Sequence, residues 1–422
     1  MGAVGEPGAT AWPWAARVGF RFCFCYFLLF GVVFTQILFL YTGFVTGFLS
    51  EESVLWQRPW LTAGPAWVGR HVFGVPVRLR LSESGDQAYI WVLVGCLLVV
   101  AGAATLVWTA LARRTEYARL GAWFVLAARI ALGTQLLWYG IAKLVPNQMP
   151  SPPLTTLLEP FGDFTRMEVL WNQIGIAPGY QMLLGAAEVL AAVLLLTTRT
   201  ATLGALLALV CLTQVFVLNL AYDVPVKLFS FHLLLLSWVV LAPQARGLIA
   251  VLVLHRPAAP LLPPPVPARR LATVLPVLFG LLAGVTCVRD AWQSWHEWGY
   301  GAPKPALYGI WDVTEFSLDG RALPPLTTDE IRWQRLVVDL PGPAYQRMNG
   351  DFVPGALDET RGVLTLADTA LTYRRPDPDH LILHGDRHRH QLSITLVRRD
   401  LADFRVRRPG FHWVQETLPR DP

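Results

Sequence analysis

The sequence predicts a bundle of about seven membrane-spanning helices followed by a small all-β barrel. The chain of 422 residues is 54% hydrophobic and only 15% charged, with a mean hydropathy of +0.42, and this composition is not that of a soluble domain. Seven apolar runs are long enough to cross a lipid bilayer, which takes about 20 residues each. Residues 303–422 instead alternate between apolar and polar side chains, as β-strands do.

The seven runs define a helical domain over residues 1–302. In chain order they are residues 20–41, 89–111, 120–144, 180–196, 201–220, 226–241 and 271–288. An eighth run, residues 248–254, is too short to span a bilayer. We therefore expect a multi-pass protein with an odd number of spans.

The short loops carry their basic residues on one side of the predicted bundle. These are Arg17, Arg21, Arg113, Arg114, Arg119, Arg199, Arg246, Arg256, Arg269 and Arg270. Because cytoplasmic loops are enriched in Lys and Arg, we expect the amino terminus to lie in the cytoplasm. The β domain then lies outside the cytoplasmic (inner) membrane.

The β domain is expected over residues 303–422. Its predicted strands are residues 307–316, 332–339, 345–352, 362–366, 370–374, 380–384, 387–397 and 404–407, with a further extended piece at 411–415. Gly385-Asp386 fits a two-residue hairpin turn. About eight strands with short turns favour a closed or nearly closed barrel, which has no exposed edges.

Charge and cysteine patterns exclude two classes of function. From Pro303 onward, sixteen basic residues face seventeen acidic ones, so the β domain lacks the basic surface that nucleic-acid binding requires. All five cysteines fall in apolar runs and none forms a C-x-x-C motif. A thiol–disulfide relay needs two accessible sulfurs that can exchange, so we do not expect one here.

A histidine-rich run at residues 380–390 tempts a metal-site interpretation. In the predicted hairpin, His380 and His384 point to one face of the sheet and His388 and His390 to the other. Four ligands on opposite faces cannot converge on one ion. We therefore expect a solvated strand pair and no metal.

Several segments resemble known families. Gly309-Ile310-Trp311 resembles the G-x-W of lipocalin-like barrels, although a core Trp of any β-sandwich would fit as well. Residues 139–144 (YGIAKL), 185–190 (GAAEVL) and 198–204 (TRTATLG) resemble the pattern of DoxX-like four-helix membrane proteins, over about residues 118–245.

The chain is similar to a longer, largely uncharacterised DoxX-like branch. The shared features are Gly85-Asp86, residues 222–228 (YDVPVKL) and residues 410–416 (GFHWVQE), whereas residues 417–420 depart from the usual Pro-x-Asn-Arg ending. DoxX-like proteins are linked to quinone-dependent sulfur oxidation and to membrane redox or thiol-stress complexes, and many have no assigned activity. The resemblance thus implies a quinone-like carrier and a redox partner protein.

The segment before the sixth run holds several candidate residues. Asp223 can cap the helix, and Lys227, four residues later, can pair with it. A structural cap with a snorkelling lysine explains both residues without chemistry. It does not explain His232, which lies one or two turns deeper in the predicted span. Ionisable groups at that depth usually mark a function or an internal network.

Lys143 ends the third run and permits two interpretations. It is either an interfacial anchor beside Trp138 and Tyr139, or a cation that attracts an anionic or quinone-like head group. In the second case the long connection 146–178, with its amphipathic stretch 167–171, would lie over the site as a lid.

Helix rise places four polar side chains at a similar depth. Arg129, Glu188 and His232 come to the same level, and Gln214 lies near it. We expect an Arg129–Glu188 ion pair and a common chamber that opens past Lys143, Asp223 and Lys227. A purely structural clasp between helices is the alternative.

Three functions are compatible with these patterns. The first is a subunit or accessory of an extracytoplasmic redox process that uses a lipophilic carrier such as quinone. The second is a non-catalytic module in which the barrel binds a lipid or another apolar ligand. The third is a proton-abstraction enzyme with an intramembrane Lys or His as its base. A hollow barrel would favour the second, and a filled barrel with a polar chamber between the helices the first or third.

Overall fold

The computed structural model describes residues 12–34, 58–80, 82, 84–268, 270–366, 369–408 and 413–414. Within them, seven helices are long and apolar enough to cross a membrane, which confirms the predicted multi-pass helical region. They are α1 (Trp14–Val33), α5 (Ala88–Leu111), α6 (Ala118–Leu144), α8 (Pro178–Leu196), α9 (Ala201–Ala221), the continuous stretch Lys227–Leu252 that begins with α10 (Lys227–Leu241), and α12 (Leu271–Glu297). Residues 35–41 of the first predicted run, and Arg269, lie outside the described part.

Shorter helices join these spans. The predicted short eighth run overlaps α11 (Ala245–Leu252), which continues the sixth span after α10 through the 3-10 turn η3 (Ala242–Gln244). Helix α4 (Arg58–His71) precedes α5. The amphipathic stretch 167–171 forms part of α7 (Arg166–Gly175), which begins at a capping box between Thr165 and Glu168.

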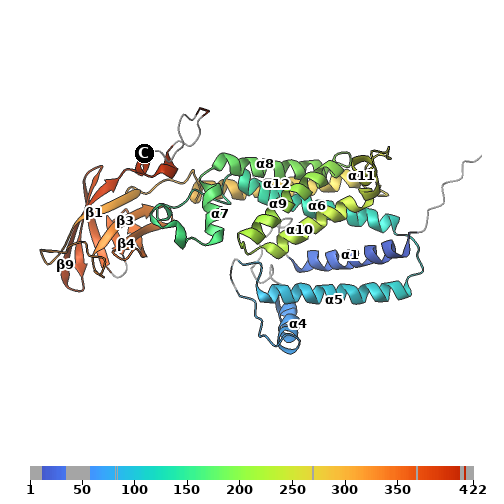
Figure 1. Cartoon of the computed structure of the whole chain (residues 1–422), viewed down its shortest axis with the longest axis horizontal. Coiled ribbons are helices and arrows are strands. Elements are labelled where there is room, and N and C mark those ends of the chain that lie inside the picture. Colours follow the sequence, from blue (N-terminus) through green and yellow to red (C-terminus); the bar gives the residue numbers. More distant parts are fainter. Residues whose placement is uncertain are drawn as a thin grey trace, which may run out of the picture. The chain divides into compact units, whose positions relative to one another are not determined.

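Small residues bring the central helices close together. A Cβ atom on Gly185 of α8 would stand 2.5 Å from the carbonyl oxygen of Gly140 in α6, so only glycine fits there. Gly204 of α9 meets the α8 backbone in the same way, because its Cβ would lie 2.8 Å from the amide nitrogen of Leu195. Close backbone contact of this kind is how helices associate in lipid, where no hydrophobic force drives them together. Helices α1 and α5 run side by side (Figure 1).

The carboxyl-terminal part is a closed antiparallel barrel, as predicted. Its eight strands follow the sequence order, and the first pairs with the last to close the sheet. They are β1 (Gly309–Leu318), β3 (Trp333–Asp339), β4 (Gly342–Arg347), β5 (Phe352–Asp358), β6 (Val363–Leu366), β7 (Thr369–Asp377), β8 (His380–Arg387) and β9 (His390–Arg399). A two-residue strand, β2 (Arg321–Ala322), pairs antiparallel with the end of β1.

Side chains fill the barrel interior. Trp311, Phe316, Leu336 and Leu364 are at most 1% exposed and belong to one core cluster that draws on strands around the barrel. The Trp311 indole N–H donates to the Leu307 carbonyl oxygen at 2.8 Å, which satisfies its polar atom inside the apolar core. The core is therefore packed at the place where a hollow barrel would hold its ligand.

Three details of the predicted barrel are wrong. The single strand predicted at 345–352 is the junction of β4 and β5, and residues 404–407 form a 3-10 turn, η5 (Arg405–Arg407). The β8–β9 hairpin turns at His388 and Arg389, which have φ values of 52° and 71°, and Arg387 pairs with His390. Gly385 lies within β8, where its Cβ would stand 2.6 Å from the Ala370 carbonyl oxygen. The piece predicted at 411–415 lies mostly outside the described residues.

The chain divides into two compact units. The helical unit comprises Met1–Gln148 and Gly179–Trp292, and the β unit comprises Met149–Pro178 and Gln293–Pro422. The long connection after α6 thus packs with the barrel. Leu154 of this connection is 1% exposed and contacts the outward-facing Ile310 and Val337 of β1 and β3. It covers an apolar patch on the outer face of the barrel.

Candidate functional site

A groove of about 710 Å³ lies in the helical unit between α1, α5, α9 and α10. Its walls are almost entirely apolar. The lining residues are Phe22, Cys23, Tyr26, Phe27, Trp91, Val94, Leu98, Phe216, Leu220, Lys227, Leu228, Phe231, His232, Leu235, Trp238, Val239 and Ala242. We call it the Tyr26–His232 groove, after the two residues that carry most of its polar chemistry.

Tyr26 of α1 and His232 of α10 form a buried hydrogen-bonded pair on the groove wall. The Tyr26 hydroxyl lies 2.5 Å from Nε2 of His232, and Nδ1 of the same ring lies 2.6 Å from the Leu228 carbonyl oxygen. A carbonyl oxygen can only accept, so Nδ1 carries the ring proton and donates to it. Because burial disfavours a charged imidazolium, Nε2 is taken as the acceptor of the Tyr26 hydroxyl proton, and both side chains are then neutral and satisfied.

Aromatic packing holds the histidine ring in place. The rings of His232 and Phe30 are parallel within 5°, with their centroids 4.1 Å apart. Phe30 in turn stacks on Phe34 at 4.2 Å. This stack and the Leu228 hydrogen bond fix the ring in one orientation, so Nε2 points steadily at the Tyr26 hydroxyl.

Asp86, which precedes α5, caps the first turn of α10. Its two carboxylate oxygens accept from the backbone N–H groups of Lys227 and Leu228 at 2.8 and 3.0 Å. The Gly85 N–H donates to the Pro225 carbonyl oxygen at 2.8 Å, which ties the two segments together. A negative charge at a helix amino terminus is favoured by the free N–H groups and the helix dipole.

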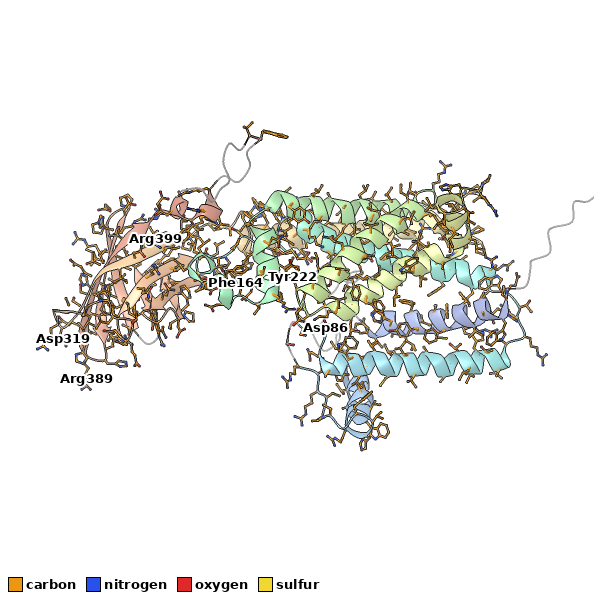
Figure 2. The ribbon with its side chains drawn as sticks, in the orientation of Figure 1. Asp86, Phe164, Tyr222, Asp319, Arg389 and Arg399 are labelled. Carbon is orange, nitrogen blue, oxygen red and sulfur yellow. The ribbon has the colours of Figure 1, made fainter. Side chains whose placement is uncertain are left out.

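The predicted cap by Asp223 is therefore wrong, but its predicted ion pair with Lys227 is confirmed. The Lys227 Nζ lies 2.7 Å from Asp223 Oδ1 and 3.6 Å from Asp86 Oδ2. Asp223 has a φ of 54° and a largely exposed side chain, a geometry that directs its carboxylate to the lysine and not to the helix end. Figure 2 labels Asp86 beside Tyr222, the residue before Asp223.

A second ion pair lies between α6 and α8. The Lys143 Nζ donates to both carboxylate oxygens of Glu188, at 2.8 and 2.7 Å, and both side chains are buried. Lys143 is thus neither an exposed interfacial anchor nor an unpaired cation. The close approach of Gly140 and Gly185 sets the two helices in the register that places this pair together.

The expected Arg129–Glu188 pair does not form. The Arg129 guanidinium is buried but donates to the Leu195 and Leu196 carbonyl oxygens at the end of α8. Those residues are seven and eight positions beyond Glu188, or about 10 to 12 Å along the helix axis. The ends of α6 and α8 do not mark equal depths in the membrane, so counting residues from them places Arg129 too close to the level of Glu188.

The structure therefore places the candidate residues in separate settings. Lys227 and His232 line the Tyr26–His232 groove, Glu188 is bonded to Lys143, and Arg129 of α6 donates to the last carbonyl oxygens of α8. Gln214 is exposed on α9 and does not line the groove. The predicted common chamber is replaced by an apolar groove with one hydrogen-bonded pair.

Sequence reasoning missed Tyr26 and Asp86 as members of the site. Tyr26 lies inside an aromatic run of α1, where no spacing distinguishes it from its neighbours. Asp86 belongs to the Gly85-Asp86 pair that carried the family resemblance, and this was an available signal. An acidic residue next to a glycine just before an apolar run fits a role at a helix end.

The described residues of the β unit offer paired surface groups and no candidate metal site. Among the described residues, no three His, Cys, Asp or Glu side chains gather in a way that could hold an ion. The His390 imidazole lies 2.6 Å from Asp319 Oδ2 and, by its hydrogen bond, lowers the pKa of that carboxyl. Asp319 and Arg389 lie at the same end of the barrel (Figure 2).

Comparison with known proteins gives one weak relationship. The chain is 28% identical over 123 residues to the Bacillus subtilis (strain 168) protein "Uncharacterized protein YwoB", and the match covers 29% of this chain and 78% of that protein. No family model matches the sequence. No solved structure matches it either.

Proposed function

We propose that this membrane protein binds a lipophilic carrier of the quinone type in the Tyr26–His232 groove. In this proposal the protein serves an extracytoplasmic redox process, together with a redox partner protein, from the cytoplasmic membrane. The amino terminus is cytoplasmic and the barrel extracytoplasmic. The observation that carries the proposal is an apolar groove of about 710 Å³ with a buried histidine–tyrosine pair on its wall.

The dimensions and lining of the groove support this ligand class. Small-molecule sites usually measure 300 to 1,000 Å³ and combine apolar walls with a few placed polar groups. The walls suit a hydrocarbon tail, and the Tyr26–His232 pair suits one polar head. A fully polar substrate would lose its hydration here without enough partners to replace it.

The Tyr26–His232 pair can serve both redox forms of such a carrier. The Tyr26 hydroxyl can turn its proton from Nε2 to a quinone carbonyl oxygen, and Nε2 can accept from a quinol hydroxyl. Histidine is also the side chain best suited to pass a proton near neutral pH. The same two atoms thus recognise a carbonyl acceptor and a hydroxyl donor.

Two observations weigh against the other functions. The buried core cluster inside the barrel, which includes Trp311 and Phe316, favours a filled barrel over a hollow one. Proton abstraction by a lysine needs a free amine, whereas Lys143 and Lys227 are both bonded to carboxylates. A lipid acyl chain in the groove remains the competing function, because apolar walls accept it equally well.

Binding of two matched probes to the purified full-length protein distinguishes these functions. We expect a decyl-substituted benzoquinone to bind about tenfold more tightly than decylbenzene, which corresponds to roughly one hydrogen bond. In His232→Phe, which keeps an aromatic ring against Phe30, this preference should disappear. Quenching of tryptophan fluorescence reports binding of the quinone, since Trp91 and Trp238 line the groove. The affinity of decylbenzene, which does not quench, is measured by its competition with the bound quinone.

The control variant is His71→Phe, on the exposed surface of α4. It should keep the wild-type preference for the quinone. Equal affinity of the wild-type protein for the two probes would refute the quinone proposal and favour lipid binding.

A further inference from the structure

A second cavity, of about 800 Å³, lies at the opposite end of α10 from Asp86, where α8 ends. Residues 122–129 of α6, the 198–199 turn after α8, and segment 260–266 contribute to its lining. We call it the Arg129 cavity. No residue of the Tyr26–His232 groove lines it.

Arg129 is a buried cation that does not use all of its hydrogen-bond donors. Its side chain is 2% exposed, and its Nε and Nη2 atoms donate to the Leu195 and Leu196 carbonyl oxygens at 2.9 to 3.3 Å. Nη1 donates to none of the described residues, and none of their carboxylates forms an ion pair with this guanidinium. A buried charge without an opposite charge is costly, and an anion in the cavity would remove that cost.

A second guanidinium lines the same cavity. Thr198 and Arg199 lie two and three residues after the end of α8, and neither side chain has a hydrogen-bonding partner among the described residues. No Asp or Glu is among the lining residues. The residues that line the cavity therefore include two arginines and a threonine, and none of them carries a carboxylate.

The wall opposite α6 is fixed in place. The Thr202 hydroxyl donates to the Leu261 carbonyl oxygen at 2.6 Å, and Val266 is buried against Ala122 and Leu126. Four prolines in the 260–265 segment restrict its backbone further. A hydrogen bond and apolar packing therefore hold this wall of the cavity in place.

We propose that the Arg129 cavity binds a phosphate-type anion, held by the Arg129 and Arg199 guanidiniums and the Thr198 hydroxyl. The planar guanidinium fork matches phosphate oxygens and is the usual choice for them. The anion is either the head group of an acidic phospholipid or free phosphate. In the alternative without a ligand, Arg129 only caps the carbonyl end of α8 and complements its dipole.

The test is the thermal unfolding of the purified full-length protein with three probes. These are short-chain phosphatidylglycerol, short-chain phosphatidylcholine and inorganic phosphate. A ligand that binds the folded state raises the melting temperature with its concentration. We expect phosphatidylglycerol to raise it more than phosphatidylcholine, and Arg199→Gln to weaken the apparent affinity about tenfold, as the loss of a charged hydrogen bond does.

Arg199→Gln leaves the hydrogen bonds of Arg129 intact and should fold normally. Arg129→Gln removes the buried guanidinium and should weaken the apparent affinity more than Arg199→Gln does. Arg246→Gln, an exposed arginine outside the cavity, is the control and should behave as the wild type. An equal or larger rise with inorganic phosphate, sensitive to Arg199→Gln, would support the same site with free phosphate as its ligand. The proposal is overturned if no probe acts, or if every effect is unchanged in Arg199→Gln.

Discussion

Glu188→Gln should strongly destabilise the folded protein. It leaves the Lys143 ammonium buried between α6 and α8 without its carboxylate partner. Breaking a buried ion pair from one side costs about 3 to 5 kcal/mol, because an uncompensated charge remains in a medium of low polarity. We expect a much reduced protein level and a lower melting temperature in detergent.

Two double variants distinguish the cost of an unpaired buried charge from the cost of changing these two positions. Lys143→Met with Glu188→Leu removes both charges at similar volume and should recover most of the lost stability. The swap Lys143→Glu with Glu188→Lys should recover part of it. A Glu188→Gln variant that melts like the wild type would contradict the buried pair.

Asp86→Ala should have the second largest effect. It removes the two hydrogen bonds to the Lys227 and Leu228 N–H groups and the carboxylate 3.6 Å from the Lys227 ammonium. Loss of a helix cap costs about 0.5 to 2 kcal/mol, and hydrogen bonds to charged groups are at the upper end of the range. We expect a loss of about 2 kcal/mol, measured as the shift in melting temperature.

Asp223→Ala is the matched control for this prediction. It removes the shorter contact to Lys227, at 2.7 Å, but the Asp223 side chain is 78% exposed. Exposed ion pairs contribute little, about 0 to 1 kcal/mol. Asp86→Asn, which keeps one acceptor oxygen, should lie between the two. If Asp223→Ala is as costly as Asp86→Ala, the assignment of the cap is wrong.

Local patterns predicted the elements of this fold well. Apolar runs gave the seven helices, and period-two alternation gave the closed barrel, because each depends on neighbouring residues. The β8–β9 turn was misplaced for a tertiary reason. Gly385 is needed inside β8 for close approach to Ala370, and the positive φ values fall on His388 and Arg389.

The site was harder to predict because its contacts join distant parts of the chain. Tyr26 and His232 are 206 positions apart, and Asp86 and Lys227 are 141 apart. Helix rise gives the depth of a residue but not the direction in which it points, so Arg129 was paired with the wrong partner. The glycines of the 139–144 and 185–190 segments determine the true pair, Lys143 with Glu188, through their close packing.

Mass spectrometry of small molecules that copurify with the full-length protein in mild detergent tests the central claim most directly. If the Tyr26–His232 groove holds a lipophilic carrier, the wild-type protein should retain a molecule with a quinone head and a long apolar tail, at up to one per chain. The His232→Phe variant, purified in the same way, should retain much less of it. Recovery of phospholipid alone, or of equal amounts of quinone from both proteins, would contradict the account.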